Sequence, residues 1–405
     1  PLNDMGTFNG ELRLSAEAAL GYYYINAYLP EADFGFGANF QVAEYRKPEF
    51  EIAVSTDRTD YADSDTIQLS SEASYYFGGA VANAEVAWNL LSGAVDFDYR
   101  CPAGAVCPFY SWAESDWTDE GEPWGYNRLV ASGTGVTDAQ GKASFSVPVD
   151  LSLNTRSQRL TLEATVTDIN GQAVSNRTAV IAHKGDFYIG LAPRGYLAQT
   201  GRSKSVDVLT VDWESRPVGN VPLEVTVLEQ RWYSVREKSD TGVFYWTWEV
   251  EELPVYTATV TTGAEGKGVI TFTPPRPGSY RVRAVGRDAR ERVIRSAAFV
   301  WVWGGEGAFW RQENNNRFDL IADRNSYTVG DTAEILIASP YSGTVKALIT
   351  IERGRILETE VRTLASTSEV LRIPILADYA PNVFVSVVLV QGAEDASQGL
   401  ASFKM

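Results

Sequence analysis

Short stretches of alternating hydrophobic and polar residues recur along the whole chain. They are rich in Val, Ile, Thr, Tyr and Phe, and clusters of Gly, Pro, Asn and Asp separate them. Such a composition with a period of two residues is typical of β-strands that have one buried face. We expect strands at residues 144–147, 160–166, 223–227, 280–284, 334–337 and 383–390. Helical periodicity is nearly absent, so the pattern predicts an all-β protein.

Two short signatures repeat about 130 residues apart, a spacing too long for a solenoid repeat and typical of a whole domain. The first is a polar turn that contains Tyr61, Tyr196 and Tyr327. The second is a turn with Gly6, Gly141 and Gly266, where glycine can adopt φ > 0 and lead into the next strand. Because such a strand pair needs a second sheet to cover its apolar side, the repeats predict tandem antiparallel β-sandwiches.

Length and charge narrow the functional classes. The chain has 405 residues, 44% of them hydrophobic, and a single core stops growing near about 250–300 residues, so we expect three or four domains. The net charge of −17 argues against a nucleic-acid partner and against an anionic membrane surface. No stretch of about 18 apolar residues is present, so we predict no direct membrane insertion.

Cys101 and Cys107 are the only cysteines, and Pro102 and Gly104 between them suit a tight loop. We predict a disulfide, which would indicate a periplasmic or extracellular location. The alternative is a pair of reduced cysteines in a cytosolic protein. A metal site is disfavoured, because two cysteines and the distant His183 leave a tetrahedral site one ligand short.

Catalytic signals are sparse. His183 is the only histidine, so any Ser-His-Asp or Cys-His arrangement would need it. The sequence contains no G-x-S-x-G, H-E-x-x-H or Walker motif. We therefore interpret His183 as a structural residue at a domain junction. We predict no catalytic residue, no cofactor and no enzymatic activity.

Acidic residues gather in two places: Asp57, Asp60, Asp63 and Asp65, and Glu114, Asp116, Asp119, Glu120 and Glu122. We predict solvated acidic loops. Calcium is the alternative, since it prefers hard oxygen ligands, but neither run has the spacing of an EF-hand. A pair of glycosidase carboxylates is a weaker alternative. No metal site is predicted.

Aromatic residues concentrate in an insertion at about 96–126 and in a hairpin at about 231–256. The candidate contact surface consists of Trp112, Trp117, Trp124, Trp232, Trp246 and Trp248. Exposed aromatic rings on a β-sandwich can stack on sugars or form a protein interface. We favour a third interpretation, in which they cover their own domain or bridge to a neighbour, because Trp246 and Trp248 alternate as they would in a strand.

Several motifs carry a family resemblance. The sequence Q-V-A-E-Y-R-K-P-E-F at 41–50 resembles a junction between macroglobulin domains in the bacterial α2-macroglobulin family. The stretch 223–262, G-K-G-V-I-T-F-T-P-P-R-P-G-S-Y-R-V after it and V-W-V-W-G at 300–304 are similar to a middle macroglobulin domain. F-D-L-I-A-D-R-N-S-Y-T-V-G-D-T-A at 318–333 and I-E-R-G-R-I-L at 351–357 are similar to another. Together they cover nearly the whole chain in the family's order.

The resemblance implies tandem macroglobulin-like domains, which are antiparallel sandwiches of the immunoglobulin or fibronectin kind. We predict the C-terminal part of one domain at 1–47 and complete domains at 48–183, 184–303 and 304–405. The second of these four units holds the aromatic and acidic insertion, and the third holds the aromatic hairpin. Because residues 1–47 cannot close a sandwich alone, we expect the chain to be a piece of a longer protein.

The resemblance also implies a function: a structural scaffold segment of a broad-spectrum protease inhibitor that traps proteases after its bait is cleaved. Expected partners are proteases and the neighbouring domains, in the periplasm or outside the cell. Family members with trapping chemistry join a Cys to a Gln three residues later as a thioester, and neither Cys101 nor Cys107 has that Gln. The bait is expected beyond Met405. The alternative is a cell-surface adhesin or carbohydrate-binding array.

Overall fold

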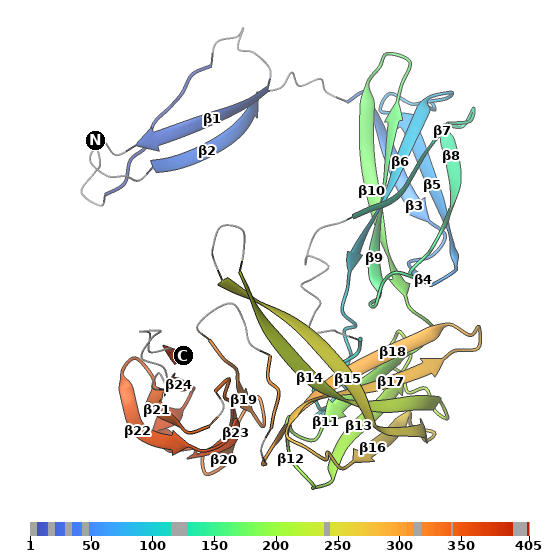
Figure 1. Ribbon diagram of the computed structural model, residues 1–405. Helices are drawn as coiled ribbons and strands as arrows, with labels where there is room; N and C mark the ends of the chain where they lie inside the picture. Colours follow the sequence, from blue (N-terminus) through green and yellow to red (C-terminus); the bar gives the residue numbers. More distant parts are fainter. Residues whose placement is uncertain are drawn as a thin grey trace.

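The computed structural model describes residues 6–14, 21–28, 35–42, 48–114, 128–238, 244–305, 307–311, 317–341, 343–391 and 403–404. Their regular structure consists of strands and one 3-10 turn, Ala377–Tyr379. Figure 1 shows three two-layered bodies that follow one another along the chain after an N-terminal hairpin. The prediction of an all-β fold of antiparallel sandwiches is therefore confirmed.

The N-terminal hairpin pairs β1 (Gly21–Tyr28) with β2 (Gly35–Val42) in antiparallel register. It lies apart from the three bodies in Figure 1. Tyr22, Tyr24 and Tyr28 are 83%, 67% and 71% exposed. The hairpin is thus a pair of strands with most of its aromatic side chains in solvent.

The first sandwich has a three-stranded and a five-stranded sheet. The smaller sheet is β3 (Phe50–Thr56), β5 (Thr66–Tyr75) and β8 (Lys142–Pro148). The larger sheet, in spatial order, is β4 (Asp60–Ala62), β10 (Ala173–His183), β9 (Gln158–Thr167), β6 (Glu85–Ala94) and β7 (Arg128–Val136). Alternate residues of β5, including Ile67 and Leu69, are buried against Leu160 and Leu162 of β9. Period-two patterning therefore places the core between the sheets.

The second sandwich repeats this arrangement. Its smaller sheet is β11 (Tyr188–Pro193), β13 (Lys204–Val211) and β16 (Lys267–Phe272). Its larger sheet is β12 (Leu197–Gln199), β18 (Val293–Trp303), β17 (Gly278–Arg287), β14 (Pro222–Lys238) and β15 (Phe244–Thr261). Tyr280, Val282 and Ala284 are fully buried in its core, as their alternation predicts. β14 and β15 are long enough to extend past the other strands as a hairpin (Figure 1).

The third sandwich is smaller. One sheet is β19 (Leu320–Ala322), β20 (Thr332–Ala338) and β23 (Ser368–Pro374). The other is β22 (Ile356–Leu364), β21 (Val345–Glu352), β24 (Phe384–Val390) and β25 (Phe403–Lys404). Their core includes Ile337, Ala347 and Leu389, all fully buried.

The repeated tyrosine turn has the same structure in the first and third sandwiches. The Tyr61 hydroxyl donates to Asp57 Oδ1 at 2.7 Å, and the Tyr327 hydroxyl donates to Asp323 Oδ1 at 2.6 Å. Tyr196 does something else: its backbone N–H donates to Asp323 O, and its hydroxyl accepts from Asn325 Nδ2. The sequence grouped three tyrosines, but only two are structurally equivalent, because Tyr196 reaches into the next sandwich.

The glycine turn is required by sterics at two positions. Gly141 and Gly266 have φ of 77° and 69°, and a Cβ on either would lie 2.4 Å from a backbone oxygen, that of Ala73 or Thr210. An L-residue with a side chain is disfavoured by both constraints. These contacts fix the strand that begins after each turn.

Candidate functional site: two junctions between sandwiches

The first junction is formed by residues 96–114, which leave the first sandwich and lie on the second. Ser111 and Leu191 exchange two backbone hydrogen bonds of 2.9 Å, so the insertion adds a bridge at the free edge of β11. The Ala297 N–H of β18 donates to Ala113 O at 3.2 Å. The insertion therefore pairs with the free edge of β11 and with a part of β18 that β12 does not reach, where backbone groups would otherwise be exposed.

An aromatic cluster fills this first junction. It consists of Phe97, Tyr99, Tyr110 and Trp112 from the insertion and Tyr188, Leu209, Val211 and Trp213 from the second sandwich. Phe97 stacks on Tyr188, with ring centroids 3.9 Å apart and planes 15° apart. Trp112 lies over Gly190, where an added Cβ would be only 2.6 Å from the indole. The absence of a side chain at Gly190 is what allows the indole to approach the strand.

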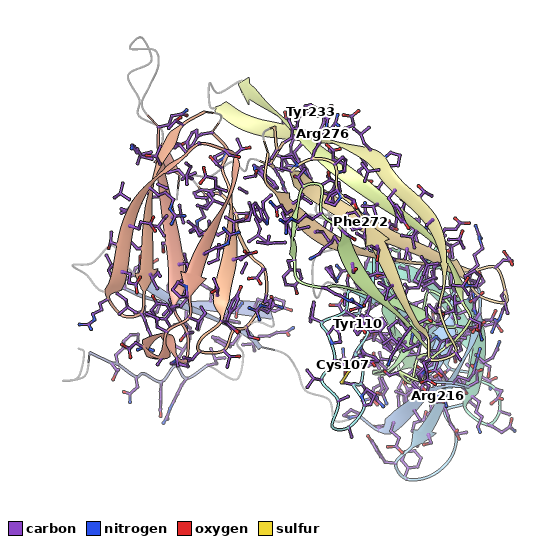
Figure 2. The ribbon with its side chains drawn as sticks, turned by 90° about the horizontal axis from the view of Figure 1, so that it is seen from below. Cys107, Tyr110, Arg216, Tyr233, Phe272 and Arg276 are labelled. Atoms are coloured by element: carbon purple, nitrogen blue, oxygen red, sulfur yellow. A yellow bond between two sulfur atoms is a disulfide. The ribbon has the colours of Figure 1, made fainter. Side chains whose placement is uncertain are left out.

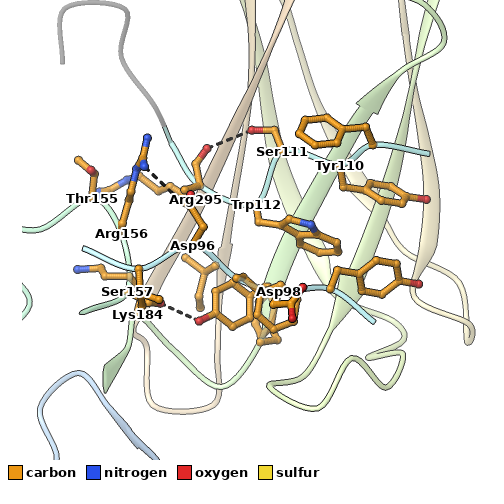
Figure 3. Close-up of a pocket in the computed structure, with 18 of the residues that line it drawn as sticks. Asp96, Asp98, Tyr110, Ser111, Trp112, Thr155, Arg156, Ser157, Lys184 and Arg295 are labelled. Carbon is orange, nitrogen blue, oxygen red and sulfur yellow. Dashed lines mark hydrogen bonds and ion pairs between the residues drawn. The ribbon is translucent and has the colours of Figure 1, made fainter. Parts of the chain in front are cut away.

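A cavity of about 530 Å³ lies beside the aromatic cluster. Figure 3 shows Tyr110 and Trp112 together on its wall, with Asp96 and Arg156 opposite. Arg156 Nη1 and Asp96 Oδ1 are 3.1 Å apart. Cys101 and Cys107 also line it and form a disulfide with an Sγ–Sγ distance of 2.15 Å (Figure 2). The disulfide closes the loop that precedes Tyr110.

His183 ends β10 and lies in the same junction. Its Nδ1 is 2.6 Å from the Tyr188 hydroxyl, and its Nε2 is 3.1 Å from Asp60 Oδ1. The Tyr188 hydroxyl is 2.8 Å from Ser157 Oγ. A neutral imidazole that accepts from Tyr188 and donates to Asp60 satisfies every member of this network. The ring also stacks on Trp213 at 4.2 Å.

Burial controls the titration of this network. Burial lowers the pKa of His183, and the hydrogen bond and charge of Asp60 offset only part of that effect. Burial likewise raises the pKa of Tyr188 to about 12. Although burial opposes it, hydrogen bonds from Thr59 and His183 lower the pKa of Asp60. We therefore assign the network as neutral His183 between a neutral tyrosine and a carboxylate.

Ion pairs extend the first junction. Arg290 Nη1 lies 2.7 Å from Asp65 Oδ1, and Arg281 Nη2 lies 2.9 Å from Glu114 Oε1. Each pair joins the second sandwich to the first sandwich or its insertion. The second pair is the more buried: the side chains of Arg281 and Glu114 are 8% and 15% exposed. Removing one partner of such a buried, hydrogen-bonded ion pair is strongly destabilising, because the other charge is left without a partner.

The second junction has an apolar cluster of its own. It combines Leu197, Trp301 and Trp303 of the second sandwich with Ala308, Trp310, Ile321, Leu336, Ala338 and Val370. Trp310 Nε1 donates to Thr367 O at 2.6 Å. Tyr196 N donates to Asp323 O at 2.8 Å, so the backbones of two consecutive sandwiches are also joined directly.

A buried lysine supports this contact. Lys204 Nζ donates to the carbonyl oxygens of Arg194, Gly195 and Leu197 at 2.8, 2.6 and 2.8 Å. These carbonyls belong to the turn that carries Tyr196. Burial lowers the pKa of Lys204 to about 8, and the charge of Asp323 partly opposes this. The Lys204 ammonium group thus stabilises this turn in the second sandwich, whereas an Asp–Tyr hydrogen bond stabilises the corresponding turn in the first and third sandwiches.

The aromatic hairpin also belongs to the second junction. Trp232 of β14 is buried, and the Arg311 guanidinium carbon lies 5.5 Å from its ring centroid and 4.4 Å from that of Trp248. Tyr233 packs against Phe309 with centroids 5.8 Å apart. The hairpin therefore holds the segment 307–311 that leads to the third sandwich.

The predicted site residues separate into three groups. Trp112, Trp232 and Trp248 contact neighbouring sandwiches or the segment between them, as described above. Trp246 pairs with Arg236 in the β14–β15 ladder. Trp117 and Trp124 lie outside the described residues, as do Asp116, Asp119, Glu120 and Glu122. Trp112, Trp232 and Trp248 thus take part in domain contacts, which does not favour a sugar-stacking platform.

The acidic run at 57–65 is divided among different partners. Asp57 accepts from Tyr61, Asp60 contacts His183, Asp63 lies 3.6 Å from Lys184 Nζ, and Asp65 pairs with Arg290. In the part of the chain that the structure describes, no group of three His, Cys, Asp or Glu side chains is arranged to hold a metal ion.

Sequence reasoning missed two groups. It found no acid beside His183, although Asp60 contacts its ring. It also overlooked Lys204, which alternates with the buried Val206 and Val208. That alternation was a usable signal, since a lysine in register with core valines must be buried and paired.

Comparisons with known proteins identify the family. Residues 190–303 match the model of bacterial macroglobulin domain 6, and residues 318–404 match that of the α2-macroglobulin bait region domain. An α2-macroglobulin homolog of a Nostoc species is 23% identical over 399 residues, covering 98% of this chain and 20% of that protein. The chain belongs to the bacterial α2-macroglobulin family. The α2-macroglobulin of Thermotoga maritima is 24% identical over 391 residues, which is 95% of this chain and 20% of that protein.

A solved α2-macroglobulin structure is also similar to this chain. The native Escherichia coli α2-macroglobulin structure covers 96% of this chain and 25% of its own, at 17% identity and a TM-score of 0.45. This chain spans about a fifth of the length of its curated α2-macroglobulin relatives. From the sequence, we expected the bait beyond Met405. The match of residues 318–404 to the bait region domain corrects that expectation, because this domain lies within the chain. None of the described segments is a helix that could cross a bilayer.

Proposed function

We propose that this chain is a scaffold segment of a protease-inhibiting α2-macroglobulin, in which two built junctions set the relative positions of three sandwiches. The observation that carries the proposal is where the aromatic side chains lie. Phe97, Trp112 and Trp310 pack between sandwiches, and the cavity that Phe97 and Trp112 line lies within the first junction. Domains joined only by a linker are expected to move independently, whereas stacked rings, paired backbones and buried ion pairs favour a fixed arrangement.

A scaffold role agrees with the chemistry of His183. Ser157 reaches the imidazole only through Tyr188, and both Ser157 and His183 are buried. A nucleophile must contact its base and be open to substrate. We therefore propose that the segment is not catalytic and that the His183 network stabilises the first junction.

Protease trapping is proposed for the longer protein, on the basis of family membership. Its partners would be proteases and neighbouring domains, and its location the periplasm or the cell exterior, which suits a disulfide at Cys101 and Cys107. In this proposal, cleavage of a bait in or after the third sandwich changes the position of that sandwich, and the two junctions transmit this change to the other sandwiches. The units 48–183, 184–303 and 304–405 would be held in one arrangement before cleavage and would move as whole bodies after it.

The test is incubation of this chain with a general protease such as trypsin. We expect slow nicking, no conjugate that survives denaturant, and unchanged protease activity on a large protein substrate. Covalent capture needs an activated acyl group, and neither cysteine has the Gln of a thioester motif. A stable conjugate, or inhibition of the protease by a near-stoichiometric amount of the chain, would refute the scaffold role.

A further inference from the structure

A line of buried and partly buried polar side chains crosses the larger sheet of the second sandwich from one junction to the other. Arg281 of β17 is contacted on one side by Glu114 of the insertion, with Nη2 and Oε1 2.9 Å apart. On its other side Arg281 Nη1 lies 3.2 Å from Glu252 Oε1 of β15. Gln230 Nε2 of β14 donates to the same Glu252 oxygen at 3.0 Å.

The far end of this line lies in the second junction. Gln230 lines a cavity of about 40 Å³ together with Ser279, Trp232, Trp310, Arg311 and Asp319. Trp310 and Arg311 belong to the segment that leads to the third sandwich. Glu114, in contrast, belongs to the insertion of the first sandwich. The four residues Glu114, Arg281, Glu252 and Gln230, which we term the polar relay, thus connect groups that face different neighbours.

Gln230 has a second arrangement available. Gln230 Oε1 and Ser279 Oγ are buried and have no hydrogen-bond partner among the described residues. Gln230 and Ser279 are directly opposed in the β14–β17 ladder, so their side chains lie on one face of the sheet. If the amide turned from Glu252 toward Ser279, both unpaired atoms could be satisfied. The cavity offers the space for that movement.

We propose that the polar relay couples the two junctions, so that disturbing one weakens the other. Glu252 Oε1 is the shared acceptor. While Glu114 holds one end of Arg281, both Arg281 and Gln230 share Glu252 Oε1. When Glu114 withdraws, Arg281 has only Glu252 as its carboxylate partner, competes with Gln230 for that oxygen and releases the amide toward Ser279. The wall of the second junction beside Trp232 and Trp310 then rearranges. This coupling does not depend on what the longer protein inhibits.

The test is hydrogen exchange of the whole chain, followed by mass spectrometry. Glu114→Gln removes the charge at the first junction, and we expect peptides covering 307–311 and 366–372 to exchange about threefold faster or more. Asp96→Asn is the matched control, because it breaks another ion pair of the insertion, that with Arg156, outside the polar relay. It should leave those two peptides unchanged.

Coupling must also act in the reverse direction. Trp310→Leu should therefore accelerate exchange at 109–113, and this effect should disappear in a Glu252→Gln background. The proposal is overturned if Glu114→Gln and Asp96→Asn give equal exchange at 307–311. It is also overturned if the β13 peptides accelerate as much as the junction peptides, since that pattern reports general loosening of the sandwich.

Discussion

Phe97 stacks on Tyr188 at a centroid distance of 3.9 Å, although the two residues belong to different sandwiches. Tyr188 is also the hydrogen-bond partner of His183, so one aromatic residue joins the insertion, the last strand of the first sandwich and the first strand of the second. The insertion is consequently part of the contact between the sandwiches. Removing its anchors should affect the neighbouring sandwich as well as its own.

Trp112 is the anchor most directly in contact with β11. We expect Trp112→Ala to lower the free energy of unfolding by about 2–4 kcal/mol, because it deletes a large, half-buried ring between two packed surfaces. Urea denaturation followed by circular dichroism measures this. Phe109→Ala is the control on the same insertion, since Phe109 is 77% exposed and should change stability by about 0.5 kcal/mol or less. Equal effects of the two substitutions would contradict the packing role of Trp112.

Gly190 should tolerate no side chain. Its added Cβ would lie 2.6 Å from the Trp112 indole, so Gly190→Ala should cost about 1–3 kcal/mol by overpacking. Gly268→Ala is a suitable comparison, because its Cβ would meet Val260 at an ordinary 3.4 Å. Chemical denaturation of both variants gives the comparison. If Gly190→Ala were as stable as Gly268→Ala, the close approach of Trp112 would be wrong.

The first junction should weaken in mild acid. The pKa of His183 in the folded chain lies below the ordinary value of 6.5, so the unfolded chain binds the proton first. The free energy of unfolding should therefore fall as the pH drops below about 6.5. His183→Gln should reduce the loss of melting temperature between pH 7.5 and pH 5.5, because His183 is the only histidine. An identical pH dependence in both proteins would exclude His183 as the titrating group.

The disulfide is tested by counting thiols. Labelling the denatured, unreduced chain with a maleimide should detect essentially no free thiol, since Cys101 and Cys107 are the only cysteines and are joined. Two labels per chain would show that the bond is absent. Because the closed loop is short, the Cys101→Ser and Cys107→Ser double variant should lose less than about 3 kcal/mol of stability.

Local patterning predicted the sheets well, because alternation within one strand determines which residues are buried. The tyrosine turn shows where this fails. Tyr61 and Tyr196 occupy similar sequence contexts, yet only the former has an aspartate four residues before it to receive its hydroxyl. The contact between Glu114 and Arg281 joins residues 167 positions apart. It depends on how the insertion docks, and no periodicity within either segment encodes that docking.

The bait region shows a similar limit. The strands β20, β21 and β24 of the third sandwich follow from their apolar alternation, but the same residues carry no signal that separates a bait domain from any other sandwich. Family comparison supplied that distinction for 318–404. The apolar alternation of one sequence therefore predicts the sandwich fold more readily than it predicts the role of one sandwich among several similar ones.

The most direct test of the scaffold account is the distribution of distances between sandwiches in solution. Spin labels carried by unnatural amino acids at the exposed positions Arg177, Glu224 and Thr359 would report each pair by pulsed electron paramagnetic resonance. The account predicts one narrow distribution for each pair. It also predicts that Trp112→Ala broadens the Arg177–Glu224 distribution far more than Phe109→Ala does. Broad distributions in the unsubstituted chain would contradict the claim that the two junctions fix the arrangement of the sandwiches.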